Sequence, residues 1–486
     1  MKMNPSSLAA LLLFVFPSAI AQKDTTFMTL SRCIRIAQTK GPLAAIARHS
    51  FENKKSSYES FTDSFYPQLS LQGDIPGYYH SISTIILPDG SSVFTPQSQA
   101  TSSLGLNIVQ KISATGGELS ISSGLNRIDL FQPSSQYYRS NPLSINYQQP
   151  LFQINTQKWD RRAQDLGYQS ATRQFAEALE DAAIDATTKF FDLYLASVNF
   201  REAFVNLTNN DTLYSISQGR FNVGKIAEND LLQSELAFLN AQTEYESAKT
   251  TLKLADQNLK IALDIPSSET VGLLPPESIP SLSIDPAAAL TAAQQNRSDM
   301  TNFELQQLTA ERGVEQARSN LFSATMTANF GYNQSAPLIF DAYHNLLDQR
   351  QLSINFTVPL YQWGAGRASV DAALAEQERT ESSLGQQRKQ FEQEVLYQVS
   401  RMNVLQRQVA VAARADTVAQ LRFRVAKDRY LIGKIDIPNL FLAESEKDNA
   451  FRSHIQTLAD YWLTYFKVRR LTLYDFEGKR SLSLEQ

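Results

Sequence analysis

Short stretches of this chain alternate between apolar and polar residues. In residues 324–332 the apolar side chains occupy every second position, and Thr325, Thr327 and Asn329 lie between them. Residues 352–360 repeat the pattern. Because successive side chains of a strand point to opposite faces, each stretch predicts a strand with one apolar and one polar face. Such a strand fits a soluble sandwich, where the apolar face meets a second sheet, or an outer-membrane barrel, where it meets lipid.

Longer segments are compatible with helix. No proline occurs between Pro150 and Pro266 or between Pro359 and Pro438, and proline interrupts helices more strongly than any other residue. A 65-residue helix would extend about 100 Å at 1.5 Å per residue, so it needs packing partners along its length. We expect helices over about 29–64, 155–219 and 230–263 in the first half, and over about 285–320, 364–432 and 438–473 in the second.

The two halves are tandem repeats. Leu143-Ser-Ile-Asn-Tyr-Gln-Gln-Pro-Leu-Phe-Gln153 reappears 209 residues later as Leu352-Ser-Ile-Asn-Phe-Thr-Val-Pro-Leu-Tyr-Gln362. At the same offset, Arg220-Phe-Asn-Val-Gly-Lys-Ile226 reappears as Arg429-Tyr-Leu-Ile-Gly-Lys-Ile435. Two matches at one offset indicate a duplicated unit, a membrane-type strand joined to a long helix.

The N-terminus has the organisation of a secretory signal peptide. Lys2 lies near the start, an apolar core runs from Leu8 to Phe16, and Ala19-Ile-Ala21 fits a cleavage site. We expect a signal peptide at 1–21, a first repeat at 22–264, a Pro-rich linker at 265–285, a second repeat at 286–474 and a C-terminal tail at 475–486.

Composition excludes several classes of function. The 45 Lys and Arg residues against 49 Asp and Glu include no basic run, which argues against a nucleic-acid partner. Cys33 is the only cysteine, so there is no internal disulfide.

Catalytic motifs are absent from the sequence. The four histidines are scattered, and there is no His-Glu-x-x-His, Cys-x-x-Cys, phosphate loop or Gly-x-Ser-x-Gly. We expect neither an enzyme nor a bound cofactor or metal. Glu177, Glu180 and Asp181 are expected to form a solvated helix face or tunnel lining rather than an acid and base.

The signal peptide, the two-faced strands and the duplicated pairs of long helices together resemble the TolC-type outer-membrane efflux proteins. The residues that carry this resemblance are the strand ends Gln-Pro-Leu-Phe-Gln153 and Val-Pro-Leu-Tyr-Gln362, the turns Phe221-Asn-Val-Gly224 and Tyr430-Leu-Ile-Gly433, and Tyr66-Pro-Gln-Leu69.

The resemblance implies an α+β membrane protein that forms a homotrimer. Each protomer would give four strands, or more, to a single barrel of 12 strands in the lipid bilayer, and its helices to a long periplasmic coiled-coil tunnel. It implies a location in the outer membrane, with the helices in the periplasm. The function implied is a passive conduit that receives substrates from a periplasmic adaptor and an inner-membrane pump of RND or ABC type, for efflux or type I secretion.

The same resemblance places a gate at the periplasmic tips of the helices. In the family, hydrogen bonds and ion pairs hold the tunnel nearly shut there, and adaptors dock. Asp230 and Tyr430 match positions that bond to each other, whereas the family's aspartate ring falls on the uncharged Asn439 and Leu442. The alternative role for Asp230 and Asn439 is helix N-capping. The expected aperture residues are Asp230, Tyr430, Lys434, Asp436 and Asn439, and the expected docking tips are Val223, Gly224, Lys225, Ile432 and Gly433.

Aromatic residues follow the predicted strands directly. They suit the aromatic girdle at a membrane boundary, or else they cap a soluble core. These residues are Phe152, Trp159, Tyr361 and Trp363.

The first half also contains two strand-like segments that the second half lacks. Residues 103–111 and 118–127 flank Ala114-Thr-Gly-Gly117. They fit an inserted hairpin beside the barrel, an elaborated extracellular loop, or extra strands in the wall.

Two functions of different classes remain open at this point. One is the export conduit, and the other is a non-conducting periplasmic coiled-coil or adhesin-like structural protein. The exported substrate and the class of pump are not determined by the sequence.

Overall fold

The computed structural model describes residues 26–131, 134–276, 279–431, 434–435 and 437–482. Contacts within the chain define two units: residues 1–43, 182–279 and 411–459 form one, and residues 44–181, 280–410 and 460–486 form the other. The helices are α1 (Leu30–Thr39), α2 (Pro42–Asp63), α3 (Thr156–Asn222), α4 (Glu228–Leu263), α5 (Pro286–Asn296), α6 (Ser298–Ser319), α7 (Ala365–Leu431) and α8 (Ile437–Thr472), with a 3-10 turn, η1 (Asp341–Tyr343). The strands are β1 (Thr26–Thr29), β2 (Gln68–Ile86), β3 (Ser92–Ile112), β4 (Gly117–Phe131), β5 (Ser134–Leu151), β6 (Val271–Leu274), β7 (Ser323–Ala336), β8 (Leu347–Thr357), β9 (Tyr474–Asp475) and β10 (Arg480–Ser481).

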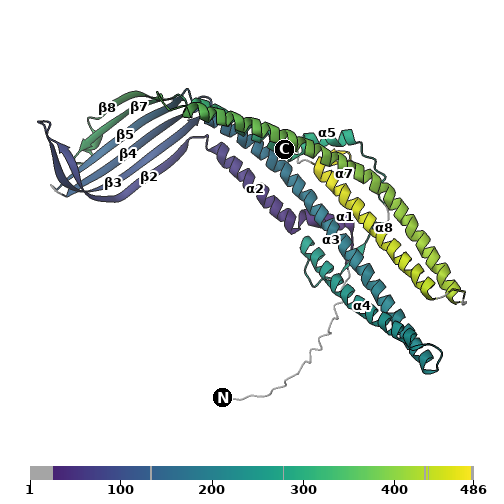
Figure 1. Cartoon of the computed structure of the whole chain (residues 1–486). Helices are drawn as coiled ribbons and strands as arrows, with labels where there is room; N and C mark the ends of the chain where they lie inside the picture. Colours follow the sequence, from purple (N-terminus) through teal and green to yellow (C-terminus); the bar gives the residue numbers. More distant parts are fainter. Residues whose placement is uncertain (1–25, 132–133, 277–278, 432–433, 436, 483–486) are drawn as a thin grey trace, which may run out of the picture. The chain divides into compact units, whose positions relative to one another are not determined.

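One antiparallel sheet contains the strands of both repeats. Its order is β2-β3-β4-β5-β7-β8, and the pairing of β5 with β7 joins the two repeats (Figure 1). The two extra segments of the first half, within β3 and β4, are therefore strands of this sheet. They lie neither in a separate hairpin nor in an irregular loop.

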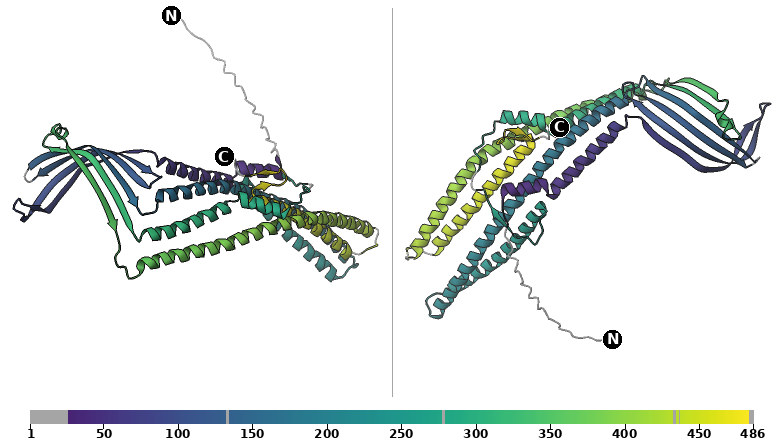
Figure 2. Two further views of the ribbon diagram at one scale, coloured as in Figure 1. Left: turned by 90° about the horizontal axis from the view of Figure 1, so that it is seen from above. Right: turned by 180° about the vertical axis from the view of Figure 1, so that it is seen from behind.

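All six strands of this sheet reach the 9 to 11 residues that a barrel wall requires, and five of them are longer. They range from 11 residues in β8 to 21 in β3. β2 and β3 pair as far as Ile86 and Ser92, whereas β4 pairs with β3 only as far as Gln99. The ends of β2 and β3 thus form a hairpin that extends beyond β4, and the sheet is strongly curved (Figure 2).

The long helices of the two repeats have identical lengths. α3 and α7 each contain 67 residues, and α4 and α8 each contain 36. α7 and α8 begin and end 209 residues after α3 and α4, respectively. The four long helices predicted from the sequence are confirmed, with ends shifted by at most a few residues.

Both shorter helices that we expected are divided in two. The segment 29–64 breaks at Gly41, where an added Cβ would lie 2.6 Å from the carbonyl oxygen of Ala37 and 2.8 Å from that of Ala262. Only glycine permits this close approach of α1 to the end of α4. The segment 285–320 breaks at Arg297, whose backbone is extended between α5 and α6.

Short strand pairs were not predicted from the sequence. β1 pairs in parallel with β6, which lies in the predicted irregular linker, and β9 pairs with β10 in the C-terminal segment. Among the residues described, no helix is long and apolar enough to cross a membrane.

Alanine and aromatic side chains fill the helix contacts. In the first unit Ala183, Ala186, Phe190 and Leu259 are fully buried. Alanine allows helices to approach closely, which is why α3 contains so many at buried positions.

Candidate functional site

The turn between α3 and α4 is built by two backbone hydrogen bonds. The N–H of Gly224 donates to the carbonyl of Phe221 at 2.8 Å, and the N–H of Lys225 donates to that of Arg220 at 2.8 Å. This pair of bonds is the Schellman motif, which requires a left-handed residue after the helix. Gly224 supplies it with a φ of +70°. Val223 and Lys225 are exposed beside Gly224.

The turn between α7 and α8 closes with the equivalent bond. The N–H of Lys434 donates to the carbonyl of Arg429 at 2.9 Å, as Lys225 does to Arg220 in the first repeat. Lys434 is exposed. Ile432, Gly433 and Asp436 lie outside the described residues.

Asp230 occupies the third position of α4. The N-cap of that helix is Ala227, which forms no side-chain capping bond. Asp230 is therefore not the N-cap, and the capping role considered for it is wrong. The carboxylate of Asp230 is exposed in the first turn of α4, together with that of Glu228. The positive end of the helix dipole stabilises negative charges at this position.

Asn439 has the corresponding place in the second repeat. It is the third residue of α8, is exposed, and is likewise not the N-cap. The backbone of Tyr430 lies in the last turn of α7, and its side chain falls outside the description. The proposed bond between Tyr430 and Asp230 therefore stays a prediction.

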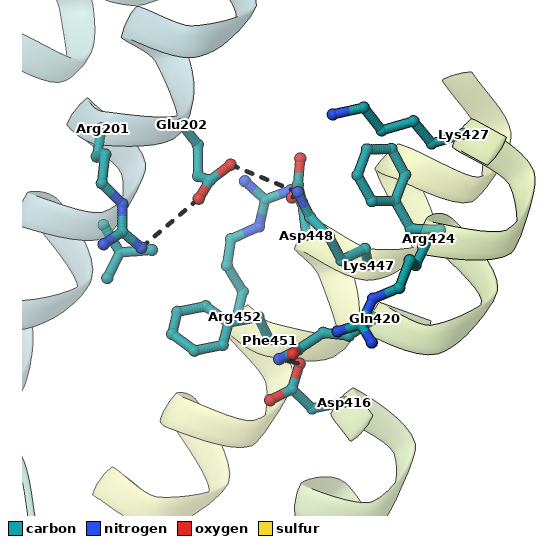
Figure 3. A pocket seen from close by; sticks show the side chains of 12 residues that line it. Arg201, Glu202, Asp416, Gln420, Arg424, Lys427, Lys447, Asp448, Phe451 and Arg452 are labelled. Atoms are coloured by element: carbon teal, nitrogen blue, oxygen red, sulfur yellow. Dashed lines mark hydrogen bonds and ion pairs between the residues drawn. The ribbon is translucent and has the colours of Figure 1, made fainter. Parts of the chain in front are cut away.

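Below the tips, side chains of α3, α7 and α8 line an open, charged cavity of about 400 Å³ (Figure 3). Lys447 of α8 lies 3.9 Å from the carboxylate of Glu202 on α3 and 3.0 Å from that of Asp448. Its ammonium group also lies 4.7 Å from the centre of the Phe423 ring on α7, a cation–π distance. Lys447 thus contacts side chains of all three helices.

Glu444 lies one helical turn from Lys447 and Asp448 on the same helix. Burial raises the pKa of Glu444, Lys447 lowers it, and Asp448 and Glu202 raise it further. The ionised carboxylate is therefore held at an energetic disadvantage. Sequence reasoning missed this cluster, because its members are spread over three helices and only an i, i+3 or i, i+4 spacing within one helix is visible in the sequence.

The second unit contains a buried ionic network. Arg297 lies 3.1 Å from Glu177 and 2.6 Å from Asp299, and the side chains of Arg297 and Glu177 are each less than a tenth exposed. Glu177 also accepts a hydrogen bond from the backbone N–H of Ser298 at 2.9 Å. These contacts hold the break between α5 and α6 against α3.

Two more acidic residues of α3 form ion pairs in the same unit. Glu180 is buried and accepts a hydrogen bond from Arg469 at 2.9 Å, and Asp181 pairs with Arg470 at 2.5 Å. The expectation that Glu177 and Glu180 lie on a solvated face or line a tunnel is wrong, because both are buried structural anions. Asp181 is half exposed, as a surface position would be.

The aromatic residues lie where the strands meet the helices. Phe152 directly follows β5, and Tyr361 and Trp363 follow β8; all three are exposed, Trp363 by 87%. The rings of Tyr361 and Trp363 are in edge-to-face contact at 4.5 Å. Trp159 is half-buried in the first turn of α3.

The two faces of the large sheet differ in chemistry. On one face Leu71 of β2 lies opposite Leu106 of β3, and Met326 of β7 lies opposite Ile354 of β8. Leu71, Leu106 and Ile354 are each about half exposed or more. The other face carries mainly small polar side chains, among them Ser70, Asn107, Ser122, Ser144, Thr327 and Ser353. The same face also carries Lys111 of β3 opposite Glu118 of β4.

Among the described residues, no group of three His, Cys, Asp or Glu side chains is arranged to hold a metal ion. Each tip presents backbone and charges to solvent, and the sheet presents one apolar face. These surfaces suit recognition and assembly.

Comparison with known proteins gives the following findings. Residues 289–461 match the family model described as outer membrane efflux protein. No curated protein matches the chain in sequence. The CmeC outer membrane channel of Campylobacter jejuni matches 94% of this chain over 87% of its own length, with a TM-score of 0.66 and 16% identity.

Other solved structures are similarly related. The outer membrane protein VceC of Vibrio cholerae matches 92% of this chain over 97% of its own, with a TM-score of 0.62 and 14% identity. The Neisseria gonorrhoeae MtrE outer membrane channel matches 91% of this chain over 88% of its own, with a TM-score of 0.58 and 14% identity. At these identities, the structural likeness establishes the fold.

Proposed function

The chain resembles the TolC-type outer-membrane efflux proteins in the sequence of residues 289–461 and in fold over almost its whole length, and from this premise we propose that it is an outer-membrane export channel. Three copies would join their sheets into one barrel and their helices into one periplasmic tunnel. The observation that carries the proposal is the six-stranded sheet with one largely apolar and one polar face.

The exposed apolar face supports a lipid environment. Leu69 and Leu71 of β2, and Leu352, Ile354 and Phe356 of β8, are each exposed by more than half. In the strands described, no second layer covers this face, and leaving it in water is unfavourable by about 25 cal/mol for each Å². A lipid bilayer would remove that penalty, as in barrels whose strands alternate between lipid and lumen.

The edges of the sheet support assembly. Within one chain, β2 and β8 each have a single neighbouring strand. Unpaired backbone groups cannot remain in a bilayer, so pairing β8 of one copy with β2 of the next would close the wall.

Apolar stripes on the helices of the first unit support the same assembly. Val411, Val418 and Val425 of α7 follow one another at seven-residue steps and are exposed, as are Leu232 and Leu239 of α4. Apolar residues at heptad spacing are typical of helices that pack against other helices. Neighbouring copies would cover these stripes.

The polar face supports a passive conduit. Serine, threonine and asparagine side chains would line most of the lumen and bind water, and the opposed Lys111 and Glu118 on that face carry charges of opposite sign. Selection of the substrate would then belong to an inner-membrane pump and a periplasmic adaptor, which would dock at the tips Val223–Lys225 and 432–434.

The domain boundaries proposed with this function follow the repeats. A signal peptide would be removed after residue 21, and the linker at 265–285 and the tail at 475–486 would together surround the middle of the tunnel. The exposed aromatic residues Phe152, Tyr361 and Trp363, with Trp159, would lie at the periplasmic boundary of the membrane.

Mass and conductance measurements test the proposal directly. We expect a detergent-stable trimer in outer-membrane fractions, with single-channel conductance in planar bilayers. A soluble species without conductance would instead support the alternative, a periplasmic coiled-coil or adhesin-like structural protein.

The docking role of the tips has its own test. Gly224→Asp and Gly224→Asn introduce side chains of nearly equal size, and no atom lies within 4 Å of an added Cβ. We expect Gly224→Asp to impair export more than Gly224→Asn, with trimers intact in both, because only aspartate adds charge to the docking surface. Equal export in both variants would contradict a charge-sensitive dock.

The gate is proposed to involve Asp230 and Tyr430. A bond from the Tyr430 hydroxyl to the Asp230 carboxylate would be charge-assisted, contributing about 1.5–3 kcal/mol. Since Asp230 is not the N-cap, Asp230→Asn removes charge without removing a cap. We expect higher resting conductance in Asp230→Asn and in Tyr430→Phe; unchanged conductance in both would assign closure to Lys434, Asp436 and Asn439 or to the adaptor.

The Lys447 contacts are proposed as a second restraint on opening. Because Lys447 connects α8 to Glu202 of α3, Lys447→Met should raise the resting conductance. Lys249 is a matched control, since its ion pair with Glu246 lies within α4 and is exposed. Equal effects of Lys447→Met and Lys249→Met would show that the contact does not restrain the helices.

A further inference from the structure

β3 and β4 have no counterparts in the second repeat. The repeated motif places β5 in the position of β8, since Leu143 and Leu352 are equivalent. The helices before the first strand, α2 and α6, are also equivalent, and both contain 22 residues. In the second repeat one hairpin, β7–β8, joins the helices, whereas in the first repeat β3 and β4 lie between the two equivalent strands.

The inserted strands occupy the middle of the sheet rather than its margin. β3 pairs with β2 along one side and with β4 along the other, and β4 pairs with β5. A wall without β3 and β4 would need β2 to pair directly with β5, whereas in this structure β2 pairs with β3 and β5 pairs with β4. The pairing therefore favours β3 and β4 as parts of the wall itself.

The apolar face continues through the inserted strands. Leu106 of β3 lies opposite Leu71 of β2, and Ile108 lies opposite both Leu69 of β2 and Ile121 of β4. Ile121 in turn lies opposite Ile145 of β5. An apolar band thus crosses the sheet from β2 to β5 without interruption.

The opposite face is equally continuous. Asn107 of β3 lies between Ser70 of β2 and Ser122 of β4, and Ser122 lies opposite Ser144 of β5. An extracellular hairpin has water on both of its faces, so it would not require one apolar and one polar face. The two-faced pattern is the one that lipid on one side and water on the other require.

We propose that β3 and β4 are strands of the transmembrane wall, so that the channel has three sheets of six strands, or 18 strands in all. This inference rests on the proposed trimeric channel. Barrel diameter grows roughly linearly with the number of strands, so the lumen would be about one and a half times as wide as with four strands from each chain. Barrels of about this size enclose an aqueous channel, so large cargo would meet its narrowest passage in the helices.

Adjacent residues on opposite faces provide a matched test. Single cysteines are placed at Leu106 and Asn107 in β3, and at Ile354 and Asn355 in β8, in a Cys33→Ala chain. Outer-membrane vesicles are treated with a membrane-impermeant methanethiosulfonate. We expect cysteines at positions 107 and 355, in place of Asn107 and Asn355, to be labelled because these positions face the lumen. Cysteines in place of Leu106 and Ile354 should stay unlabelled because these positions face lipid.

The cysteine pair in β8 distinguishes failure of the proposed channel from failure of the inference about β3 and β4. If Asn355 and Ile354 show the expected difference while Leu106 and Asn107 are labelled equally, β3 lies outside the wall and the inference is overturned, although the channel stands. If both pairs are labelled equally, the proposed channel and the inference fail together.

Deleting the inserted strands gives an independent measurement. Removal of residues 92–133 keeps the turn after β2 and joins it to β5, in the arrangement of the second repeat. Electron microscopy of trimers in nanodiscs should show a barrel about one third narrower than that of the intact chain. An unchanged diameter would overturn the inference, and the cysteine pairs decide the question if the shortened chain does not fold.

Discussion

Two glycines near the first tip should respond to the same substitution in opposite directions. Gly219 lies within α3 and Gly224 is the second residue after its end, and neither has an atom within 4 Å of an added Cβ. A methyl group therefore meets no neighbour at either site. The effect of Gly→Ala is then set by backbone conformation alone.

The expected magnitudes follow from that conformation. At Gly219, alanine favours the helix by about 1 kcal/mol. At Gly224, where φ is +70°, an L-residue is disfavoured by about 1–2 kcal/mol. The Schellman bonds at Gly224 and Lys225 should open more often in Gly224→Ala and less often in Gly219→Ala.

Hydrogen exchange of the peptide that spans residues 215–230 measures this opening. Since about 1 to 2 kcal/mol changes an opening equilibrium roughly 5- to 30-fold, exchange should be about 5 to 30 times faster in Gly224→Ala and about five times slower in Gly219→Ala. Gly224→Asn should fall between wild type and Gly224→Ala, because asparagine tolerates the left-handed region. Slower exchange in both alanine variants would refute the reasoning.

Three further predictions concern buried groups. Cys33 should resist a water-soluble maleimide in the native protein, because it is fully buried and burial raises its pKa to about 12; complete labelling by intact mass would contradict this. Glu444→Gln should raise the apparent Tm at pH 8 but leave it unchanged well below pH 4. The raised pKa of Glu444 means that its ionised form destabilises the fold once the pH exceeds that pKa, and glutamine does not ionise. A larger gain in Tm in acid than at pH 8 would contradict this reasoning. Glu177→Gln keeps an acceptor for the N–H of Ser298 but leaves Arg297 with one carboxylate fewer. It should lower the free energy of unfolding by about 3 kcal/mol in denaturant titrations. An unchanged midpoint would show that this ion pair does not stabilise the fold.

The sequence was sufficient to predict the long elements because their signals are periodic and repeated. Proline-free segments bounded the four long helices, and alternation marked the strands around Asn329 and Asn355. The turn at Gly224 was also predictable, since glycine before lysine at both tips indicated a shared helix end.

Other features depend on contacts between distant segments. Gly41-Pro42 does carry a signal for the break between α1 and α2, which sequence reasoning overlooked. The break at Arg297 has no local signal, because it is stabilised by Glu177, more than a hundred residues away. For the same reason, the burial of Glu177 and Glu180 could not be inferred from α3 alone.

The two repeats differ in the sheet and agree in the helices, and the geometry of each element explains why. An α-helix turns by about 100° for each residue, so one inserted residue would rotate every later side chain away from its packing stripe. α3 and α7, like α4 and α8, have accordingly kept equal lengths.

An antiparallel sheet tolerates insertion differently. A hairpin added between two strands returns the chain to the edge from which it left, and it preserves the direction of the following strand. β5 therefore still runs into α3 as β8 runs into α7, although β3 and β4 precede it. Strands can thus be added in pairs without disturbing the helices, which would allow the width of the barrel to change while the tunnel and its tips keep their dimensions.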